Sequence, residues 1–181
     1  ASAQATLAAA ARDPALIRLL TDPFALTPGF TGPSQPSGLI PGYDPGMNAM
    51  LVPFPMAPIN TKNVHRTNFL LGHPYGTDFV YDEMMVAPGF GEIARVTTET
   101  FATMVSLFRT GGLKPGAGPT REERDNGFYD ILFLGELPDG GRVELVVTGD
   151  RDPGYGSTSK MIAESALCLV RDVRGEGGTW T

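Results

Sequence analysis

The pattern of apolar and polar positions predicts a helix at the start of the chain. Residues 3–20 are rich in Ala, Leu and Arg, which favour helices. Asp13 and Pro14 can begin a new helical segment within this stretch, with Asp13 as the N-cap and Pro14 in the first turn. The Pro- and Gly-rich residues 23–46 then show no periodicity and predict a long loop, which is either a functional lid or disordered.

Three further stretches have the period of a helix. The first of them is expected to begin near Pro55 or Pro58 and to end at Leu71. Two more helices are predicted over residues 91–109 and residues 157–171. The chain therefore carries about four helices.

Three stretches are predicted to be strands, and the side chains of the first of them alternate. The stretches cover residues 78–86, 128–137 and 142–149, and the last two are joined by Pro-Asp-Gly-Gly, which has the chemistry of a hairpin turn. Residues 114–126 are charged and rich in Gly and Pro, and they predict another loop. A hairpin and an isolated strand among helices favour an α+β fold with a mainly antiparallel sheet.

The composition restricts the class of protein. A chain of 181 residues with 41% hydrophobic residues fits one globular domain with a core of its own. The net charge of −6 argues against nucleic acid as a partner, because phosphate binding needs a basic face. Cys168 is the only cysteine, which excludes a disulfide framework and a cysteine-based zinc site. No apolar run approaches the roughly 18 residues that span a bilayer, so we expect a cytoplasmic protein and leave peripheral membrane association open.

The two ends favour a chain cut from a longer protein. The sequence begins at Ala1, and its only tryptophan, Trp180, is the next-to-last residue. Free termini are usually polar, so a terminal tryptophan suggests a packed element that continues beyond it. An engineered boundary or a naturally short chain is the alternative.

Residues 152–160, with the sequence DPGYGSTSK, are the most suggestive of chemistry. The S-x-x-K pattern of serine β-lactamases is present, but its partner motifs S-D-N and K-T-G are absent, and the spacing does not fit a Walker A loop. We expect Ser157 to cap the last helix. Together with Thr158, Ser159 and the nearby Lys160, it could also hold a phosphate or carboxylate at the helix start, and both roles stay open.

Polar residues on the second predicted helix form another candidate site. Asn60, Arg66 and Asn68 are either a solvated face or the lining of a cleft. His65 and His73 have no acidic partner at metal-ligand spacing, so no metal site is predicted. The charged residues 121–124 are interpreted as solvated surface. No Gly-x-Gly-x-x-Gly follows a predicted strand, so this chain alone offers no nucleotide site.

Three segments together resemble a known family. Residues 53–68 (PFPMAPINTKNVHRTN), 75–83 (YGTDFVYDE) and 152–161 (DPGYGSTSKM) are similar to the saccharopine dehydrogenase-like oxidoreductases. The similarity is closest to the branch that includes the trans-acting enoyl reductases, and it covers nearly the whole chain. Pro55 and Pro58 depart from the pattern of that branch, which has mostly small or aliphatic residues there.

The resemblance implies an NAD(P)-dependent oxidoreductase whose Rossmann domain is absent from this chain. Residues 1–181 would be its C-terminal substrate and oligomerisation domain, inactive alone, and the substrate in the enoyl reductase branch would be an unsaturated acyl chain. The resemblance assigns no catalytic residue. From the residues themselves we expect substrate contacts at Asn60, Arg66 and Asn68, and cofactor contacts at Tyr155, Ser157 and Lys160. The alternative is a non-catalytic interaction or lipid-docking module that uses the hairpin and the loop over residues 23–46.

Overall fold

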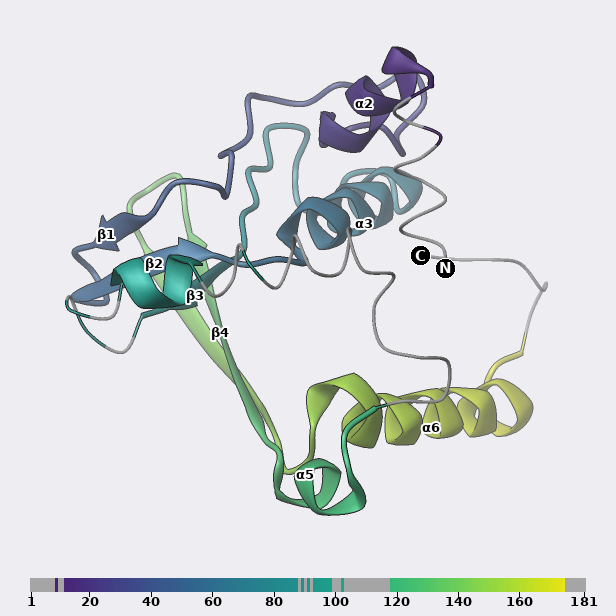
Figure 1. Ribbon diagram of the computed structural model, residues 1–181. Helices are drawn as coiled ribbons and strands as arrows, with labels where there is room; N and C mark the ends of the chain where they lie inside the picture. The colour runs from purple at the N-terminus through teal and green to yellow at the C-terminus, as the bar shows by residue number, and fades with distance from the viewer. Residues whose placement is uncertain are drawn as a thin grey trace. The chain divides into compact units, whose positions relative to one another are not determined.

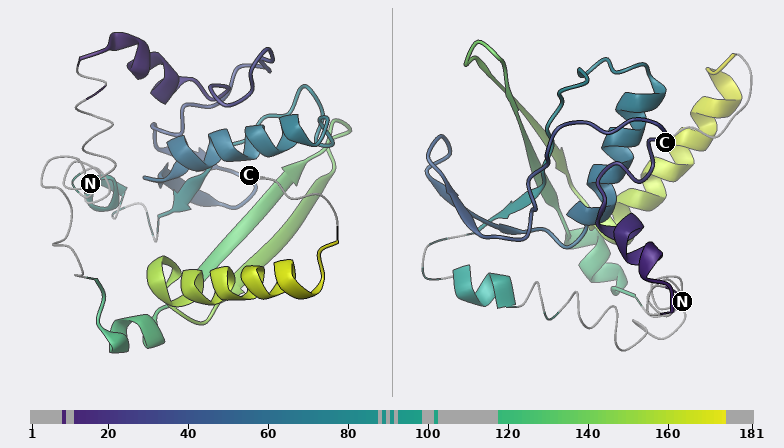
Figure 2. Two further views of the ribbon diagram at one scale, coloured as in Figure 1. Left: turned by 90° about the vertical axis from the view of Figure 1, so that its right-hand side faces the viewer. Right: turned by 90° about the horizontal axis from the view of Figure 1, so that it is seen from above.

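The computed structural model describes residues 9, 12–87, 89, 91, 93–98, 102 and 118–174. The described residues before 113 and those from 118 to 174 form two compact units, which are treated separately below (Figures 1 and 2). The boundary between the units falls in the Gly- and Pro-rich stretch of the sequence around residues 111–119. Both units combine helices with antiparallel strands, so the predicted α+β class is confirmed.

The first unit begins with helix α2 (Pro14–Thr21). The Asp13 carboxylate accepts a hydrogen bond of 2.9 Å from the Ala15 backbone N–H, as expected for an N-cap in front of Pro14. The predicted restart of the helix at this point is confirmed. Most of the predicted helix before residue 12 lies outside the described residues.

A small antiparallel sheet follows, in the order β1-β2-β3. Its strands are β1 (Gly42–Asp44), β2 (Ala49–Pro53) and β3 (Met84–Val86). In the central strand Val52 has an exposed fraction of 0%, which makes it the most deeply buried large side chain among the described residues. β1 and β2 were not predicted, and β1 lies inside the stretch that was expected to be all loop.

The predicted strand over residues 78–86 is right only at its last three residues. The reason is that the Tyr81 backbone N–H donates to the side-chain Oε1 of Gln35, at 3.0 Å, and not to a neighbouring strand. The Gln35 amide in turn donates to the Phe79 carbonyl at 3.2 Å. The glutamine side chain therefore satisfies the backbone where a neighbouring strand was expected, and no ladder forms before Met84.

Helix α3 (Ala57–Leu70) confirms the second predicted helix. Pro58 lies in its first turn, where a missing N–H costs nothing. Gly72 follows its last residues with a φ of +76°, a conformation that glycine adopts readily at helix ends. The loop before the sheet packs on this helix, since the Phe24 and His65 rings lie 4.7 Å apart between centroids.

The third predicted helix is only partly covered by the structure. Residues 93–98 and residue 102 are helical, and the other residues between 99 and 109 lie outside the described part of the chain.

The second unit starts with a helix that was predicted as loop, α5 (Arg121–Asn126). It begins with a capping box: the Thr120 hydroxyl accepts from the Glu123 N–H at 3.2 Å, and the Glu123 carboxylate accepts from the Thr120 N–H at 2.7 Å. The prediction of a loop over residues 114–126 is therefore wrong for this short helix.

The predicted hairpin is confirmed as β4 (Tyr129–Glu136) and β5 (Arg142–Gly149), with Phe133 opposite Leu145. Its turn places Gly140 at a φ of +81°, which explains a glycine there. One face of the hairpin carries, beyond the half-buried Tyr129, only apolar side chains, and these are exposed in the described structure. They are Ile131, Phe133, Val143, Leu145 and Val147.

A single π-helical turn, η2 (Pro153–Ser157), leads into α6 (Thr158–Arg171), which confirms the last predicted helix. In Figure 1 the short α5 lies beside the beginning of α6. The Asp152 backbone N–H donates to the Arg124 carbonyl at 3.0 Å and ties the two segments together. This junction carries the candidate site.

Candidate functional site

The Asp152 side chain organises the turn before α6. Its carboxylate accepts hydrogen bonds from the backbone N–H groups of Tyr155 at 2.7 Å, Gly156 at 3.1 Å and Gly154 at 3.3 Å. These hydrogen bonds, led by the one from Gly156, hold the pKa of Asp152 below its usual range. The backbone donors that the sequence suggested for an external anion are thus occupied by the protein's own carboxylate.

Ser157 has a different role from the predicted one. It is buried, and its hydroxyl donates to the Arg151 carbonyl at 3.2 Å instead of capping α6. Ser157 occupies the predicted N-cap position of α6, but the predicted capping by its side chain is wrong, because the Asp152 carboxylate accepts from the N–H groups of the turn instead. The serine anchors the turn to the segment that precedes it.

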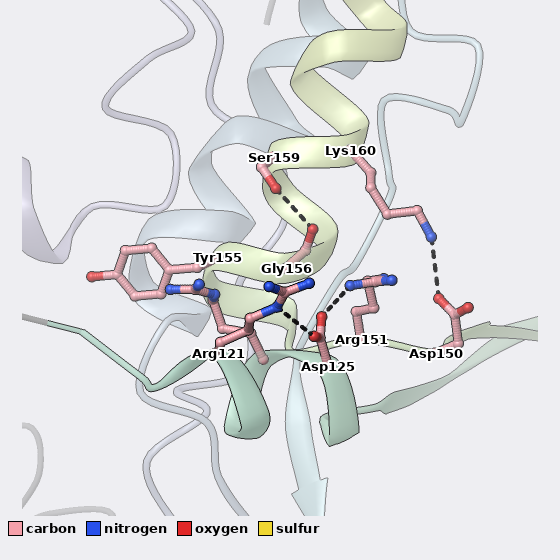
Figure 3. A pocket seen from close by; sticks show the side chains of 9 residues that line it. Arg121, Asp125, Asp150, Arg151, Tyr155, Gly156, Ser159 and Lys160 are labelled. Atoms are coloured by element: carbon pink, nitrogen blue, oxygen red, sulfur yellow. Dashed lines mark hydrogen bonds and ion pairs between the residues drawn. The ribbon is translucent and has the colours of Figure 1, made fainter.

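A pocket of about 470 Å³ opens beside this turn (Figure 3). Its lining comes from α5, from the residues after β5, and from the start of α6. The lining residues are Arg121, Arg124, Asp125, Asp150, Arg151, Tyr155, Gly156, Ser159 and Lys160. Four of these side chains are cationic and two are carboxylates, a local net charge of +2 in a chain of net charge −6.

Ion pairs hold the cationic groups around the pocket. Arg121 Nε lies 3.4 Å from Asp125 Oδ2, and Arg151 Nη1 is hydrogen-bonded to the other oxygen of the same carboxylate. On the opposite side, Lys160 Nζ lies 3.2 Å from Asp150 Oδ1 and lowers the pKa of that carboxyl. Figure 3 shows Arg121 and Arg151 directed toward the Asp125 carboxylate and Lys160 directed toward Asp150.

Two of the three predicted cofactor residues line this pocket, Tyr155 and Lys160, whereas Ser157 lies buried beneath it. The sequence analysis missed the arginines of α5, which were assigned to solvated surface. A signal was present, because Thr120 and Glu123 have the spacing of a capping box and predict a helix start. Within such a helix, Arg121 and Arg124 are three residues apart and share a face.

The predicted substrate residues lie in the first unit, on α3, and each binds a different segment of the protein. Asn60 Nδ2 donates to Glu83 Oε2 at 2.8 Å, and Arg66 Nη1 donates to the Leu26 carbonyl at 2.8 Å. Asn68 is buried, with Nδ2 donating to the Gly76 carbonyl at 2.9 Å. All three side chains therefore have structural partners, and their contact with a substrate stays a prediction.

Glu83 connects Asn60 to a second polar group. Its other carboxylate oxygen accepts a hydrogen bond from the Tyr81 hydroxyl at 3.0 Å. Burial, and then the charge of Glu83, raise the pKa of Tyr81 above its usual value. At neutral pH this phenol is a hydrogen-bond donor that holds its proton.

His65 is part of an aromatic core. Its ring lies between Phe24 and Phe79, with centroid distances of 4.7 and 5.9 Å, and burial lowers its pKa. Within the described ranges no group of three His, Cys, Asp or Glu side chains could hold a metal ion. The same residues contain no helix that is both long and apolar enough to cross a membrane.

A complete dinucleotide site does not fit the described residues. All of their paired strands are antiparallel, whereas dinucleotides bind at the carboxyl ends of parallel strands followed by a Gly-rich turn. The pocket beside α6 therefore offers less than a complete dinucleotide site: it has cationic donors for one anionic group of a ligand.

Comparison with known proteins shows similarity along almost the whole chain. The chain is 31% identical to a candidate trans-acting enoyl reductase of Mycobacterium tuberculosis strain H37Rv, over 95% of this chain and 46% of that protein. It is 30% identical to the trans-acting enoyl reductase of Mycobacterium bovis strain BCG, over 90% of this chain and 44% of that protein. Identity to the trans-acting enoyl reductase of Mycobacterium ulcerans is 27%, over 90% of this chain.

The chain thus has homologues named trans-acting enoyl reductase, and it spans about half of their length. No family model matches the chain. No solved structure matches it either.

Proposed function

We propose that this chain is the substrate-side part of an NAD(P)-dependent oxidoreductase that reduces the double bond of an enoyl substrate. The observation that carries the proposal is the similarity to proteins named enoyl reductases over 95% of the chain. The three segments that resemble the same branch lie in both units, at α3, at the residues before β3 and at the start of α6.

Enoyl reduction sets requirements that this chain meets only in part. A hydride is added to one alkene carbon and a proton to the other, and donors to the carbonyl oxygen stabilise the charge that develops there. A nicotinamide supplies the hydride when it is bound. Since the described residues form no complete dinucleotide site, the cofactor would be held mainly by a further part of the enzyme.

The residues of this chain would orient the substrate. Arg66 uses one of its five N–H groups on the Leu26 carbonyl, so it keeps donors for a carbonyl oxygen. Asn60 likewise keeps one amide hydrogen after its bond to Glu83. Asn68 is buried and bonded at both ends of its amide, so we propose that it positions the loop around Gly76 and reaches the substrate only through that loop.

The test is reduction by the protein made from its complete reading frame. A short 2-enoyl thioester and NADPH are supplied, and NADPH oxidation is followed by absorbance together with the saturated product. We expect turnover by the complete protein and none by residues 1–181 alone. An intact, folded complete protein that oxidises neither NADPH nor NADH with enoyl thioesters of several chain lengths would sink the proposal.

A second function is favoured by the open apolar face of β4 and β5. Leu145 and Val143 are 60% and 57% exposed there, which is unusual for a strand face without polar residues. A lipid-docking module would expose such a face. Flotation of the 181-residue chain with phosphatidylcholine vesicles distinguishes this function: binding that is lost on Leu145→Asp supports it, and chain that stays out of the vesicle fraction refutes it.

A further inference from the structure

The cationic side chains around the pocket exceed what its carboxylates neutralise. Arg121 and Arg151 share the single carboxylate of Asp125, and Lys160 pairs with Asp150. Arg124 directs Nη1 to the Pro119 carbonyl at 3.2 Å, and its charge also contributes to the lowered pKa of Asp152. The lining residues carry four cations and two carboxylates, and even with the adjacent Asp152 carboxylate counted the cations remain in excess, which favours an anionic ligand.

The geometry of the arginines fits a tetrahedral anion. Asp125 binds one guanidinium on each of its oxygens, which holds Arg121 and Arg151 on the same side of the pocket. Each guanidinium carries five N–H donors and spends one of them in these contacts, so most donors remain available. Arginine presents these donors as a planar fork that matches phosphate oxygens in pairs.

The N-terminus of α6 itself is excluded as the anion site. Three backbone N–H groups of the preceding turn donate to the Asp152 carboxylate, and a second anion at the same donors would meet a negative charge at contact distance. An anionic ligand is therefore directed to the side chains of α5, Arg151 and Lys160. This distinguishes the pocket from a simple helix N-terminus.

The pocket also has room for more than a phosphate ion. Its volume of about 470 Å³ lies in the range of small-molecule sites, and the Tyr155 ring is 54% exposed where it contributes to the lining. One side of the ring is supported by Gly118, where an added Cβ would lie 3.6 Å from the ring. The exposed part of the ring can pack against an organic group that follows the phosphate.

From this arrangement we propose that the pocket binds the phosphate group of an organic phosphate ester, with Arg121, Arg124 and Lys160 as its ligands and Arg151 as a further donor. Two sources share this chemistry in an enoyl-reducing enzyme: the phosphates of a nucleotide cofactor and the phosphate of the pantetheine arm of an acyl thioester, which is a monoester in the free arm and a singly charged diester when the arm is linked to a carrier. This inference deepens the proposed function, but it concerns binding by this chain and does not require turnover.

Calorimetric titration of the whole 181-residue chain provides the test, with two matched pairs of probes. Adenosine 5′-monophosphate is compared with adenosine, and 4′-phosphopantetheine with pantetheine. We expect saturable binding, with Kd on the order of 1 mM or tighter, for at least one phosphorylated probe and at least tenfold weaker binding of its partner that lacks the phosphate. The pair that shows the difference identifies the source of the phosphate.

The variants Arg121→Gln and Lys160→Gln test the assignment of the ligands. Both side chains are exposed, at 88% and 57%, so neither substitution threatens the fold. Each should weaken binding of the phosphorylated probe about tenfold, because a charge-assisted hydrogen bond is lost. The control is Arg171→Gln on the same helix, since Arg171 lies 11 residues from Lys160, about 16 Å along the axis.

Two results would overturn the proposal. One is the absence of saturable binding by every phosphorylated probe at low ionic strength, where charged contacts are strongest. The other is equal binding by the two pocket variants and by Arg171→Gln, which would show that the overall charge and not this pocket attracts the probe. Neither result depends on reductase activity, so failure of this inference and failure of the proposed function are separable.

Discussion

Replacing Asn68 by alanine separates a structural role of this residue from a direct role in substrate binding. Its side chain is 3% exposed and bridges α3 to the turn that follows it. The amide donates to the Gly76 carbonyl at 2.9 Å, and its oxygen accepts from the Tyr75 N–H at 3.0 Å. The turn also contains His73 at a φ of +63°, a conformation that needs support from outside the local backbone.

The expected cost follows from these two hydrogen bonds. Each contributes about 1 kcal/mol net, and the backbone groups left without the amide lose somewhat more where water cannot replace it. Alanine also recovers a few tenths of a kcal/mol of helix propensity relative to asparagine. We therefore expect Asn68→Ala to lower the free energy of unfolding by about 2 kcal/mol.

Urea unfolding followed by far-UV circular dichroism measures this change in the 181-residue chain. The matched control is Asn63→Ala, on the same helix, since Asn63 is exposed and gains the same helix propensity. The control should differ from the parent by less than about 0.5 kcal/mol. The difference between the two variants then isolates the contribution of the buried amide.

A loss of less than about 0.5 kcal/mol for Asn68→Ala would refute the structural argument. In that case the residue would be free to act as the sequence suggested. The complete enzyme would then show a raised KM for the enoyl substrate with unchanged stability, an outcome that a positioning role does not produce.

Three further predictions test the core and the turn. Burial lowers the pKa of His65, so the folded state keeps its imidazole neutral while the unfolded chain takes up a proton near pH 6.5. The free energy of unfolding should therefore fall between pH 7 and 5, by at most about 1.4 kcal/mol per pH unit. In His65→Leu it should fall less steeply. An alanine Cβ at Gly127 would lie 2.5 Å from the Asp152 backbone nitrogen, so urea unfolding should show Gly127→Ala to be about 2 kcal/mol less stable. In the control Gly154→Ala the added Cβ would lie 3.5 Å from its nearest neighbour, so this substitution should cost less than about 1 kcal/mol. Val52→Ala removes a side chain of 0% exposure from β2, and thermal unfolding should show a loss of about 2–3 kcal/mol; no measurable shift would contradict the assignment of Val52 to the core.

The hairpin and α6 could be predicted because their signals are local. Residues 129–136 and 142–149 contain short apolar runs typical of strands, and the turn between them contains the glycine that its positive φ requires. The final helix keeps its apolar positions at helical spacing along its whole length. Neither element depends on a distant partner for its identity, so the local sequence is sufficient.

The strands of the first unit could not be predicted in the same way. β1 and β3 have three residues each, which is too short for a period to be visible. Residues 78–83 alternate well, yet no strand forms there. Gln35, which is 46 positions from Tyr81 in the sequence, accepts the hydrogen bond of the Tyr81 backbone N–H. That choice depends on a long-range contact, which a local pattern does not contain.

The candidate pocket was predicted in part for a related reason. Tyr155 and Lys160 belong to the motif that the sequence singled out, and both line the pocket. Arg124 is brought there by the contact of α5 with the turn, in which its carbonyl accepts from the Asp152 N–H. A close approach of two backbones at Gly127 makes this contact feasible, and nothing in the sequence reveals which segment that glycine faces.

Asp152 changes the kind of anion site that this chain can offer. The sequence suggested binding by free backbone N–H groups at the start of a helix, a site that tolerates any small anion. Because the Asp152 carboxylate fills that position, selectivity passes to guanidinium groups, which favour ligands with paired oxygens such as phosphates. Carboxylates also have paired oxygens but carry one charge and two oxygens, whereas a phosphate monoester offers three oxygens and up to two charges to the four cationic side chains of the pocket. A phosphate ester should therefore bind better than a carboxylate of the same size, and the preference should diminish as Arg121 and Lys160 are removed in turn.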